Sequence, residues 1–449
     1  MHNMKNLMQL CLPILLAPFL LTGCGGGGSG SSGVSTSPAS KWTGTKQLGT
    51  ASAITIANGI AVDSNGNIYV TGSTSGALDA NVLVGTQDLF LTKYNSIGVR
   101  NSTKQLGVST KATASNAIAI DTNNNVYIVG TTAGGLDGNT LTGTQDLFLM
   151  MFDAANNKVR TKQLGVSAKA TVATGVAVDL NGNVYVVGYT NGDLDGITLT
   201  GTQNFFVVTY NNNGTKIRTM LLGVASYITA ATGVSVDGNG TVYVAGYTYG
   251  GLDGNTLSGN KDFFLTSYSS TGTKIATTQL GVAGWATSGN AVTVDFSGNT
   301  YVAGYTLGGL DSNTLTGAQD MFMTKYDPAG NKVRTKQLGV AGKMTEANSV
   351  VVNANGTVYV AGSTYGGLDG NSLTGIQDSF ITTYDASGNK IRTKQLGITG
   401  KYTVAKGGAV DGNGSTYIAG STTGGLDGNT LAGTQDFFIT KYDAAGVKQ

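Results

Sequence analysis

The chain has 449 residues, of which only 12% are charged, and its 27 Lys and Arg nearly balance its 25 Asp and Glu. This balance argues against a nucleic-acid-binding protein, because such proteins carry a clear basic excess. The only histidine is His2, and the only cysteines are Cys11 and Cys24. Thiol or histidine catalysis, disulfides and Cys/His metal sites are therefore excluded from the rest of the chain.

Residues 1–23 predict a lipoprotein signal peptide. Lys5 precedes an apolar run from Leu7 to Leu21, which is shorter than the roughly 20 residues of a membrane-spanning helix. The run ends in LTGC, which is similar to the lipobox of bacterial lipoproteins and implies a lipid on Cys24. The alternative is an ordinary signal peptide with an incidental cysteine. In a Gram-negative cell, Gly25 after the cysteine implies the outer membrane, so we expect an outer-membrane lipoprotein of the bacterial cell envelope.

Residues 24–40 begin with the expected lipid site and continue as a Gly/Ser-rich segment, which predicts a flexible tether. From residue 41 onward a motif recurs every 58 residues without an insertion. It reads KQLG or a close variant, and a fixed period of this length indicates an array of stacked supersecondary units. The marked position is occupied by Gln47, Gln105, Gln163, Leu221, Gln279, Gln337 and Gln395.

Each repeat predicts four strands, which in the first copy span residues 57–63, 67–74, 88–95 and 99–106. All four runs are rich in Val, Ile, Thr, Tyr and Phe and are bounded by Gly, Asn, Asp or Ser. Short turns join the first strand to the second and the third to the fourth, which predicts two antiparallel hairpins. The turn position carries Gly, or Asn at Asn124 and Asn156, as expected for a positive φ. No segment after the leader has apolar residues at helical spacing, so the class is all-β.

The number of repeats and the positions of the outer strands favour a ring. Seven units of four strands match a β-propeller. The last copy ends after its third strand, whereas an extra fourth strand, residues 41–48, precedes the first copy. We therefore predict that residues 41–449 form a seven-bladed β-propeller of four-stranded antiparallel blades, closed by an N-terminal strand that completes the last blade. A linear solenoid would explain neither end.

Three motifs carry a family resemblance: DxxGNxYVxG at the first hairpin, DxFxxKYDxxG at the third strand, and QLG after the fourth. Together they resemble the bacterial seven-bladed β-propeller repeat called SBBP, over residues 41–449. The resemblance implies the fold. It implies no common enzymatic activity, because a shared fold does not carry one.

Most acidic residues are copies of one another at four repeat positions. The Asp63 and Asp153 types begin the two hairpin turns, where a short carboxylate accepts bonds from nearby amides. A third set precedes the third strand: Asp88, Asp146, Asp262, Asp320, Asp378 and Asp436. The fourth set lies in the long connection between the second and third strands, and its members are candidate binding residues: Asp79, Asp137, Asp195, Asp253, Asp311, Asp369 and Asp427.

Long loops on a rigid scaffold often carry binding sites. The alternative for the loop acids is structural, with each Asp folding back on its own amides. Calcium is only weakly indicated, because DSNGN resembles the start of an EF-hand loop but lacks the later Glu. No other metal and no cofactor is expected. Basic residues alternate along the fourth strand, as in Lys158, Arg160 and Lys162, which favours protection of an outer edge over an anion-binding stripe.

Aromatic residues break the sevenfold repetition in blades 3, 4 and 5. They are candidate ligand contacts, because rings clustered on one face can stack on sugars or anchor a partner. The alternative is packing between blades. The six residues are Tyr189, Tyr227, Tyr247, Tyr249, Trp285 and Tyr305.

These observations favour a monomeric, lipid-anchored propeller that contacts the membrane through its anchor and presents its long loops to an envelope protein or a glycan without catalysis. A carbohydrate-active lyase or hydrolase using Asp, Tyr or Lys is the first alternative. A purely structural surface protein is the second.

Overall fold

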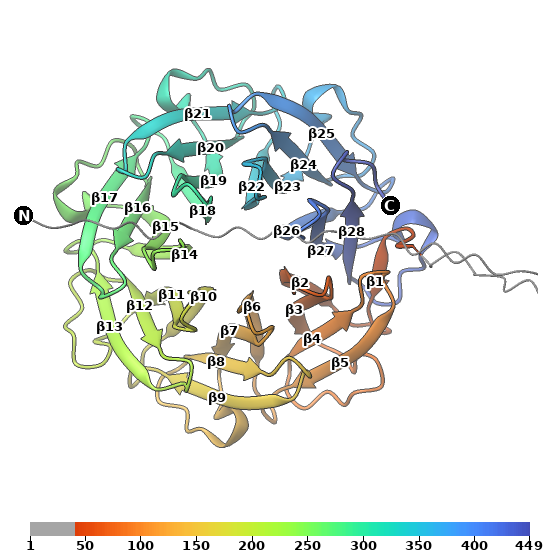
Figure 1. Ribbon diagram of the computed structural model, residues 1–449, viewed down its shortest axis with the longest axis horizontal. Helices are drawn as coiled ribbons and strands as arrows, with labels where there is room; N and C mark the ends of the chain where they lie inside the picture. Colours follow the sequence, from red (N-terminus) through yellow and green to blue (C-terminus); the bar gives the residue numbers. More distant parts are fainter. Residues whose placement is uncertain (1–40) are drawn as a thin grey trace, which may run out of the picture. The chain divides into compact units, whose positions relative to one another are not determined.

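Seven four-stranded antiparallel sheets stand around a central axis in the computed structural model, which describes residues 41–449 (Figure 1). Each sheet is one blade, and the chain runs outward through its strands before passing to the next blade. The predicted seven-bladed propeller is therefore confirmed. The expected signal peptide and the tether with Cys24 lie outside the described residues. Within residues 41–449, no helix is long and apolar enough to cross a membrane.

Two strands of each blade lie nearest the axis. The innermost strands are β2 (Thr55–Val62), β6 (Thr113–Ile120), β10 (Thr171–Val178), β14 (Thr229–Val236), β18 (Thr287–Val294), β22 (Thr345–Val352) and β26 (Thr403–Val410). The second strands are β3 (Ile68–Thr74), β7 (Val126–Thr132), β11 (Val184–Thr190), β15 (Val242–Thr248), β19 (Thr300–Thr306), β23 (Val358–Thr364) and β27 (Thr416–Thr422).

The other two strands form the outer part of each blade. The third strands are β4 (Asp88–Tyr94), β8 (Asp146–Phe152), β12 (Asn204–Tyr210), β16 (Asp262–Tyr268), β20 (Asp320–Tyr326), β24 (Asp378–Tyr384) and β28 (Asp436–Tyr442). The outermost strands are β5 (Arg100–Leu106), β9 (Lys158–Leu164), β13 (Lys216–Leu222), β17 (Lys274–Leu280), β21 (Lys332–Leu338), β25 (Lys390–Leu396) and β1 (Lys46–Leu48).

The predicted ring closure is confirmed by β1, which lies beside β28 as the outer strand of blade 7 (Figure 1). Lys46 is opposite Ile439, and Leu48 is opposite Phe437. Just before β1, Trp42 packs edge-on against Tyr417, with ring centroids 5.7 Å apart. The first and last parts of the described chain therefore share one sheet.

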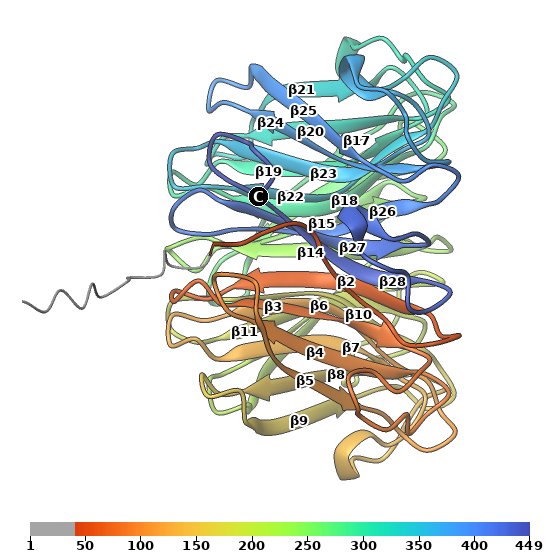
Figure 2. The ribbon, with the colours of Figure 1, turned by 90° about the vertical axis from the view of Figure 1, so that its right-hand side faces the viewer.

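The connections separate into two faces at opposite ends of the strands (Figure 2). The tight-turn face carries both hairpin turns of every blade, and its turn residues have positive φ, as at Gly66 and Asn124. Asp63 accepts hydrogen bonds from the amides of Asn65 and Asn67, as predicted for this set of acids. The long-loop face carries the connections between the second and third strands and between blades. It includes five short 3-10 turns: η1 (Leu136–Gly138), η2 (Leu252–Gly254), η3 (Leu310–Ser312), η4 (Leu368–Gly370) and η5 (Leu426–Gly428).

The core lies between blades, because each sheet packs both faces against its neighbours. Phe90 of blade 1 stacks on Phe437 of blade 7 at 5.1 Å, and Phe205 stacks on Phe264 in the same way at 5.0 Å. Burying one such ring contributes about 1.5–3 kcal/mol.

A ring of side-chain hydrogen bonds also links the innermost strands. Asn58 donates through Nδ2 to the carbonyl of Ser115 in the next blade, and Asn or Thr makes the corresponding bond at five further junctions. The residue at the seventh junction is the exposed Lys406, for which no such bond is formed. The junction between blades 7 and 1 is therefore linked differently from the others.

Candidate functional site

The loop acids of the long-loop face are ion-paired. Arg100 Nη2 lies 2.6 Å from Asp79 Oδ1, and Lys158 pairs with Asp137 in the same way. The alternative in which each Asp folds back on its own amides is wrong, because the main partner is a cation. In blades 1 to 6 this cation belongs to the outermost strand, and in blade 7 it is Lys448, which follows β28. The remaining pairs are Lys216 with Asp195, Lys274 with Asp253, Lys332 with Asp311, Lys390 with Asp369 and Lys448 with Asp427.

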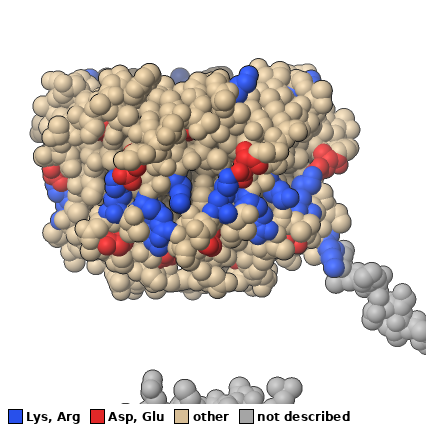
Figure 3. Space-filling view, turned by 90° about the horizontal axis from the view of Figure 1, so that it is seen from above, with Lys and Arg blue, Asp and Glu red and all other residues tan. Residues whose placement is uncertain are grey.

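These pairs change the interpretation of the basic outer strands. Burial opposes ionisation of Asp137, but hydrogen bonds from Lys158 and Thr161 outweigh it and hold the pKa of Asp137 below its ordinary value. Figure 3 shows the resulting band of Lys and Arg along the rim with acidic side chains beside it. Edge protection alone is therefore an incomplete account of the stripe, since the first basic residue of β5, β9, β13, β17, β21 and β25 also holds a long loop.

The acids that precede the third strands are buried and have a structural role. Asp88 is fully buried and accepts hydrogen bonds from the amides of Val84 and Gly85 and from Nε2 of Gln105. The repeated Gln of the QLG motif is thus the partner of a buried carboxylate. Neither residue of this pair is free to bind a ligand.

Three of the six predicted aromatic residues end neighbouring second strands on the long-loop face. Tyr189, Tyr247 and Tyr305 close β11, β15 and β19, and each is half-buried. Tyr249 contacts Tyr247 edge-on, with centroids 6.1 Å apart. Burial raises the pKa of Tyr189 and Tyr247, and the neighbouring tyrosines add to the effect on Tyr247. The structure therefore brings four predicted residues into one cluster.

Sequence reasoning missed the residue at the centre of this cluster, Lys261. Its side chain is only 8% exposed, and Nζ donates a 2.8 Å hydrogen bond to Oη of Tyr305. Nζ also lies 4.8 Å from the ring centroid of Tyr247 and 4.9 Å from that of Tyr305. The sequence contained a signal, because the other six repeats have Gln at this position: Gln87, Gln145, Gln203, Gln319, Gln377 and Gln435.

The other two predicted aromatics lie beside the cluster, in the connections between blades. Tyr227 and Trp285 are 49% and 52% exposed. A Cβ added at Gly250 would contact the ring of Tyr227, and one added at Gly308 would contact the ring of Trp285. Each ring therefore rests on the long loop of the blade that follows it in the chain. The corresponding residues elsewhere are mostly lysines: Lys111, Lys169, Lys343 and Lys401.

Aromatic residues of this face are not confined to blades 3–5. Tyr402, which follows the same kind of connection in blade 7, is 43% exposed. What distinguishes the sector is therefore the combination of rings with the buried cation Lys261. We call Tyr189, Tyr247, Tyr249, Lys261 and Tyr305 the Lys261 cluster. In residues 41–449, no three Asp, Glu, His or Cys side chains gather as a metal site would require.

Comparison with known proteins defines the repeat. Six segments match the model of the Beta-propeller repeat SBBP: residues 44–78, 103–137, 159–195, 217–253, 277–311 and 391–427. The chain carries SBBP repeats. The structure adds β22 to β24 between the last two matched segments, so the SBBP propeller has a blade there too.

One curated relative and several solved structures are similar to this SBBP propeller. The regulatory protein FlaEY of Caulobacter vibrioides is 29% identical over 210 residues, which cover 42% of this chain and 21% of the relative. The chain thus matches about a fifth of that protein's length. A polysaccharide lyase of family PL25, an ulvan lyase, aligns with a TM-score of 0.50 at 12% identity, covering 89% of this chain and 96% of its own. The WD40 repeats of RRP9 align at 0.49 and 9% identity, covering 90% and 98%. At these identities the likeness shows the fold alone.

Proposed function

We propose that this protein is a non-catalytic binding module of the bacterial cell envelope, anchored by a lipid on Cys24, which binds a glycan or a protein on the long-loop face of blades 3–5. The Lys261 cluster carries this proposal. It breaks the sevenfold repetition at adjacent blades, and a single ligand that meets a ring requires such a local difference. The loop acids do not break the repetition, because all seven are paired in the same way.

The chemistry of the cluster favours an acidic glycan among the ligands. Half-buried tyrosine rings offer flat apolar surfaces on which sugar rings stack. Lys261 adds a positive charge that is shielded from water, and a charge in such a setting interacts more strongly with an anion than an exposed one does. Trp285 and Tyr227, at the edge of the cluster, extend the aromatic surface.

The position of the described N-terminal residues fits the proposed anchor. Trp42 lies beside Gly98, a turn glycine of the tight-turn face, so the chain joins the ring at that face. The long-loop face is at the opposite end of the strands. The start of the described chain and the Lys261 cluster are therefore on opposite faces of the ring.

Binding to envelope glycans and envelope proteins, measured on the full-length protein in detergent, tests the proposal. Trp285→Ala should weaken binding by about 2 kcal/mol, or roughly 30-fold. Lys261→Gln, which restores the residue of the other six repeats, should also weaken it. Tyr402→Ala is the matched control, because it removes an exposed aromatic residue of the same face in blade 7. Equal losses of affinity in Trp285→Ala and Tyr402→Ala would contradict a site in blades 3–5. If Trp285→Ala binds normally but melts at a lower temperature, Trp285 is a packing residue, and this result would also contradict the site.

One observation favours the enzymatic alternative, a lyase acting on an acidic polysaccharide. The Lys261 ammonium donates a hydrogen bond to the Tyr305 hydroxyl, so two groups that can transfer protons in catalysis lie side by side. The similarity to a polysaccharide lyase supports only the fold. Release of unsaturated products from acidic polysaccharides, lost in Tyr305→Phe, would support this alternative over the binding module.

A further inference from the structure

Near the tight-turn face, a groove lies between an outermost strand and the following blade, and in four of the seven grooves an arginine of that strand lies on the turn glycine of the following blade. Arg218 shows the arrangement: a Cβ added at Gly272, the turn glycine of the next blade, would lie 2.2 Å from Nη1 of Arg218. The guanidinium thus rests directly on the turn. The other three arginines lie on the corresponding glycines: Arg160 on Gly214, Arg334 on Gly388 and Arg392 on Gly446.

The groove between blades 5 and 6 shows which groups lie around the guanidinium. Arg334 lies near a tyrosine of its own blade, Tyr301, and near the turn aspartate of the next blade, Asp385. Bonds from Asn389 are the main cause of the lowered pKa of Asp385, and the charge of Arg334 adds to them. Burial raises the pKa of Tyr301, and the charge of Arg334 offsets part of that shift. Asp443 has the same place in the turn beside Arg392, but the turns beside Arg160 and Arg218 carry Asn211 and Ser269 instead. All four grooves therefore share the arginine and the turn glycine, and two of them add a turn aspartate.

Two grooves without an arginine are filled by other side chains. Between blades 7 and 1, Trp42 and Lys46 lie against the turn glycine Gly98. Between blades 1 and 2, Asn156 replaces the glycine and donates a 3.0 Å hydrogen bond to Ser102, which stands in the arginine position. In six of the seven grooves a side chain of the outer strand or its start therefore lies at the turn. The groove between blades 6 and 7 still keeps a cavity of about 490 Å³, which Tyr359 and Arg392 help to line.

The groove between blades 4 and 5 is different, because Ala276 stands in the arginine position. Nothing lies within 4 Å of a Cβ added at its turn glycine, Gly330. The third strand contributes the small Ser267 where Lys93, Lys325 and Lys441 cover the ring of the corresponding tyrosine in other blades. The result is an open cavity of about 450 Å³, within the usual size range of ligand sites.

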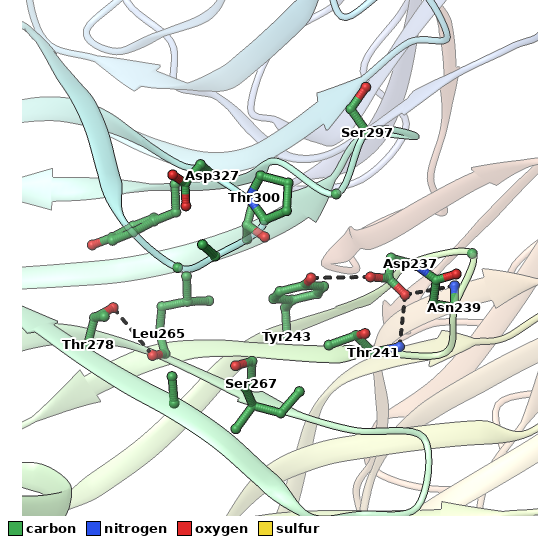
Figure 4. A pocket seen from close by; sticks show the side chains of 18 of the residues that line it. Asp237, Asn239, Thr241, Tyr243, Leu265, Ser267, Thr278, Ser297, Thr300 and Asp327 are labelled. Atoms are coloured by element: carbon green, nitrogen blue, oxygen red, sulfur yellow. Dashed lines mark hydrogen bonds between the residues drawn. The ribbon is translucent and has the colours of Figure 1, made fainter.

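The cavity keeps the groups that surround Arg334 in the groove between blades 5 and 6. Tyr243 and Asp237 of blade 4 lie on one side, joined by a 3.2 Å hydrogen bond, and Asp327 and Thr300 of blade 5 lie on the other (Figure 4). Thr300 is 1% exposed, and its Oγ1 has no hydrogen-bond partner among the described residues. Four other blades have valine at this position. No Lys or Arg lines the cavity, so its two carboxylates face no cation within it.

We propose that this cavity binds the guanidinium group of an arginine side chain supplied by a partner polypeptide. The groove of Arg334 shows that an arginine side chain fits beside a tyrosine, a turn aspartate and a turn glycine in this arrangement. Arginine suits the site better than lysine, because its planar guanidinium stacks on an aromatic ring and donates to a carboxylate at the same time. The site is on the face opposite the Lys261 cluster, so it is independent of the proposed glycan or protein site.

Calorimetric titration of the full-length protein with acetyl-Gly-Arg-Gly-amide tests the proposal. We expect one weak site for this peptide, with a Kd of about 1 mM. Two control peptides, in which lysine or citrulline replaces the arginine, should bind at least tenfold more weakly. Ala276→Arg should fill the cavity from within, abolish peptide binding and raise the melting temperature. Arg334→Ala, which empties a sister groove, should create a second site and raise the stoichiometry from one to two.

Several outcomes would overturn the proposal. Equal binding of the Lys or citrulline peptide would show that the guanidinium is not recognised. Unchanged binding in a folded Ala276→Arg protein would place the peptide elsewhere. If Ala276→Arg does not fold, Arg334→Ala decides, because the absence of a second site would show that an emptied groove does not accept arginine. A third outcome is that the arginine peptide does not bind, whereas a neutral disaccharide binds to the wild type and not to Ala276→Arg. This result would show that the cavity is a sugar site.

Discussion

Nε2 of Gln105 donates a 3.0 Å hydrogen bond to the carboxylate of the fully buried Asp88. The same side chain accepts a bond from the amide of Leu78 in the long loop, so one glutamine holds the outermost strand, the start of the third strand and the loop together. Blade 3 lacks both partners and has Asn204 and Leu221 instead. The joint replacement indicates that the glutamine recurs because it satisfies a buried charge.

The first prediction is that Gln105→Leu lowers the free energy of unfolding by about 1–3 kcal/mol, because it removes a donor from a buried carboxylate. The double variant Asp88→Asn with Gln105→Leu copies blade 3 and should recover part of the loss. Thermal or denaturant unfolding of both variants measures the coupling. Strictly additive losses would show that the two residues act independently.

Removal of residues 41–48 should lower the melting temperature and promote aggregation. The deletion takes β1 away from β28 and leaves an unpaired strand edge on blade 7. Calorimetry and light scattering detect the two effects. A chain that lacks residues 25–40 but keeps 41–48 is the control, and a deletion with an unchanged melting temperature would refute closure by this strand.

Acid should destabilise the closure of blade 7 through Asp427. Its carboxylate pairs with Lys448 and accepts a 2.5 Å bond from Thr45, and these bonds outweigh burial and lower its pKa. A lowered pKa stabilises the fold above the unfolded value of about 4, and the contribution disappears as the pH falls through the folded value. Asp427→Asn should therefore lower the free energy of unfolding by about 1 kcal/mol at pH 7. Below pH 4, the free energy of unfolding of this variant should fall less steeply with decreasing pH than that of the wild type. An unaltered pH profile would contradict this assignment.

Lys406→Asn should raise stability. Asn at this position donates to the carbonyl of the next blade at four junctions, and Thr does so at two. The new side chain would supply the missing bond to blade 1, which is worth about 0.5–1.5 kcal/mol. Asn348→Lys is the reciprocal control and should destabilise by a similar amount. A Lys406→Asn protein that melts below the wild type would show that the blade 7 to 1 junction differs in geometry.

Cys24→Ser should abolish palmitate labelling and release the protein from the membrane fraction. The LTGC motif predicts acyl chains on Cys24, and acyl chains are sufficient to attach a protein to a membrane. Fractionation with metabolic labelling measures both effects. A variant that remains with the membrane and carries no lipid would contradict the lipobox.

The fold could be predicted because its signals are local and repeated seven times: the turn Gly or Asn, the strand composition and the period. The side-chain partners could not. Asp137 meets Lys158 from a different strand, and neither the turn nor the strand pattern fixes that contact. Lys261 was visible in the sequence as the one exception at a repeat position that is otherwise Gln. Its burial beside Tyr247 and Tyr305 could not be predicted, because Tyr305 belongs to the neighbouring blade. The cavity at Ala276 was hardest to predict, because a missing side chain matters only once the arginines of the other blades are seen to fill grooves.

The strand pairing of blade 7 sets the order in which the molecule can fold. In blade 1 the paired residues of β2 and β3 are at most 19 positions apart, as for Thr55 and Thr74. Lys46 and Ile439 are 393 positions apart, the difference of their residue numbers. A contact between distant residues must overcome the entropy of closing a long loop, whereas contacts within one blade close only short loops. The first six blades can therefore form one after another before β1 pairs with β28. Until β28 has been synthesised, β1 has no partner, so closure is the last step and the most exposed to misassembly with another chain.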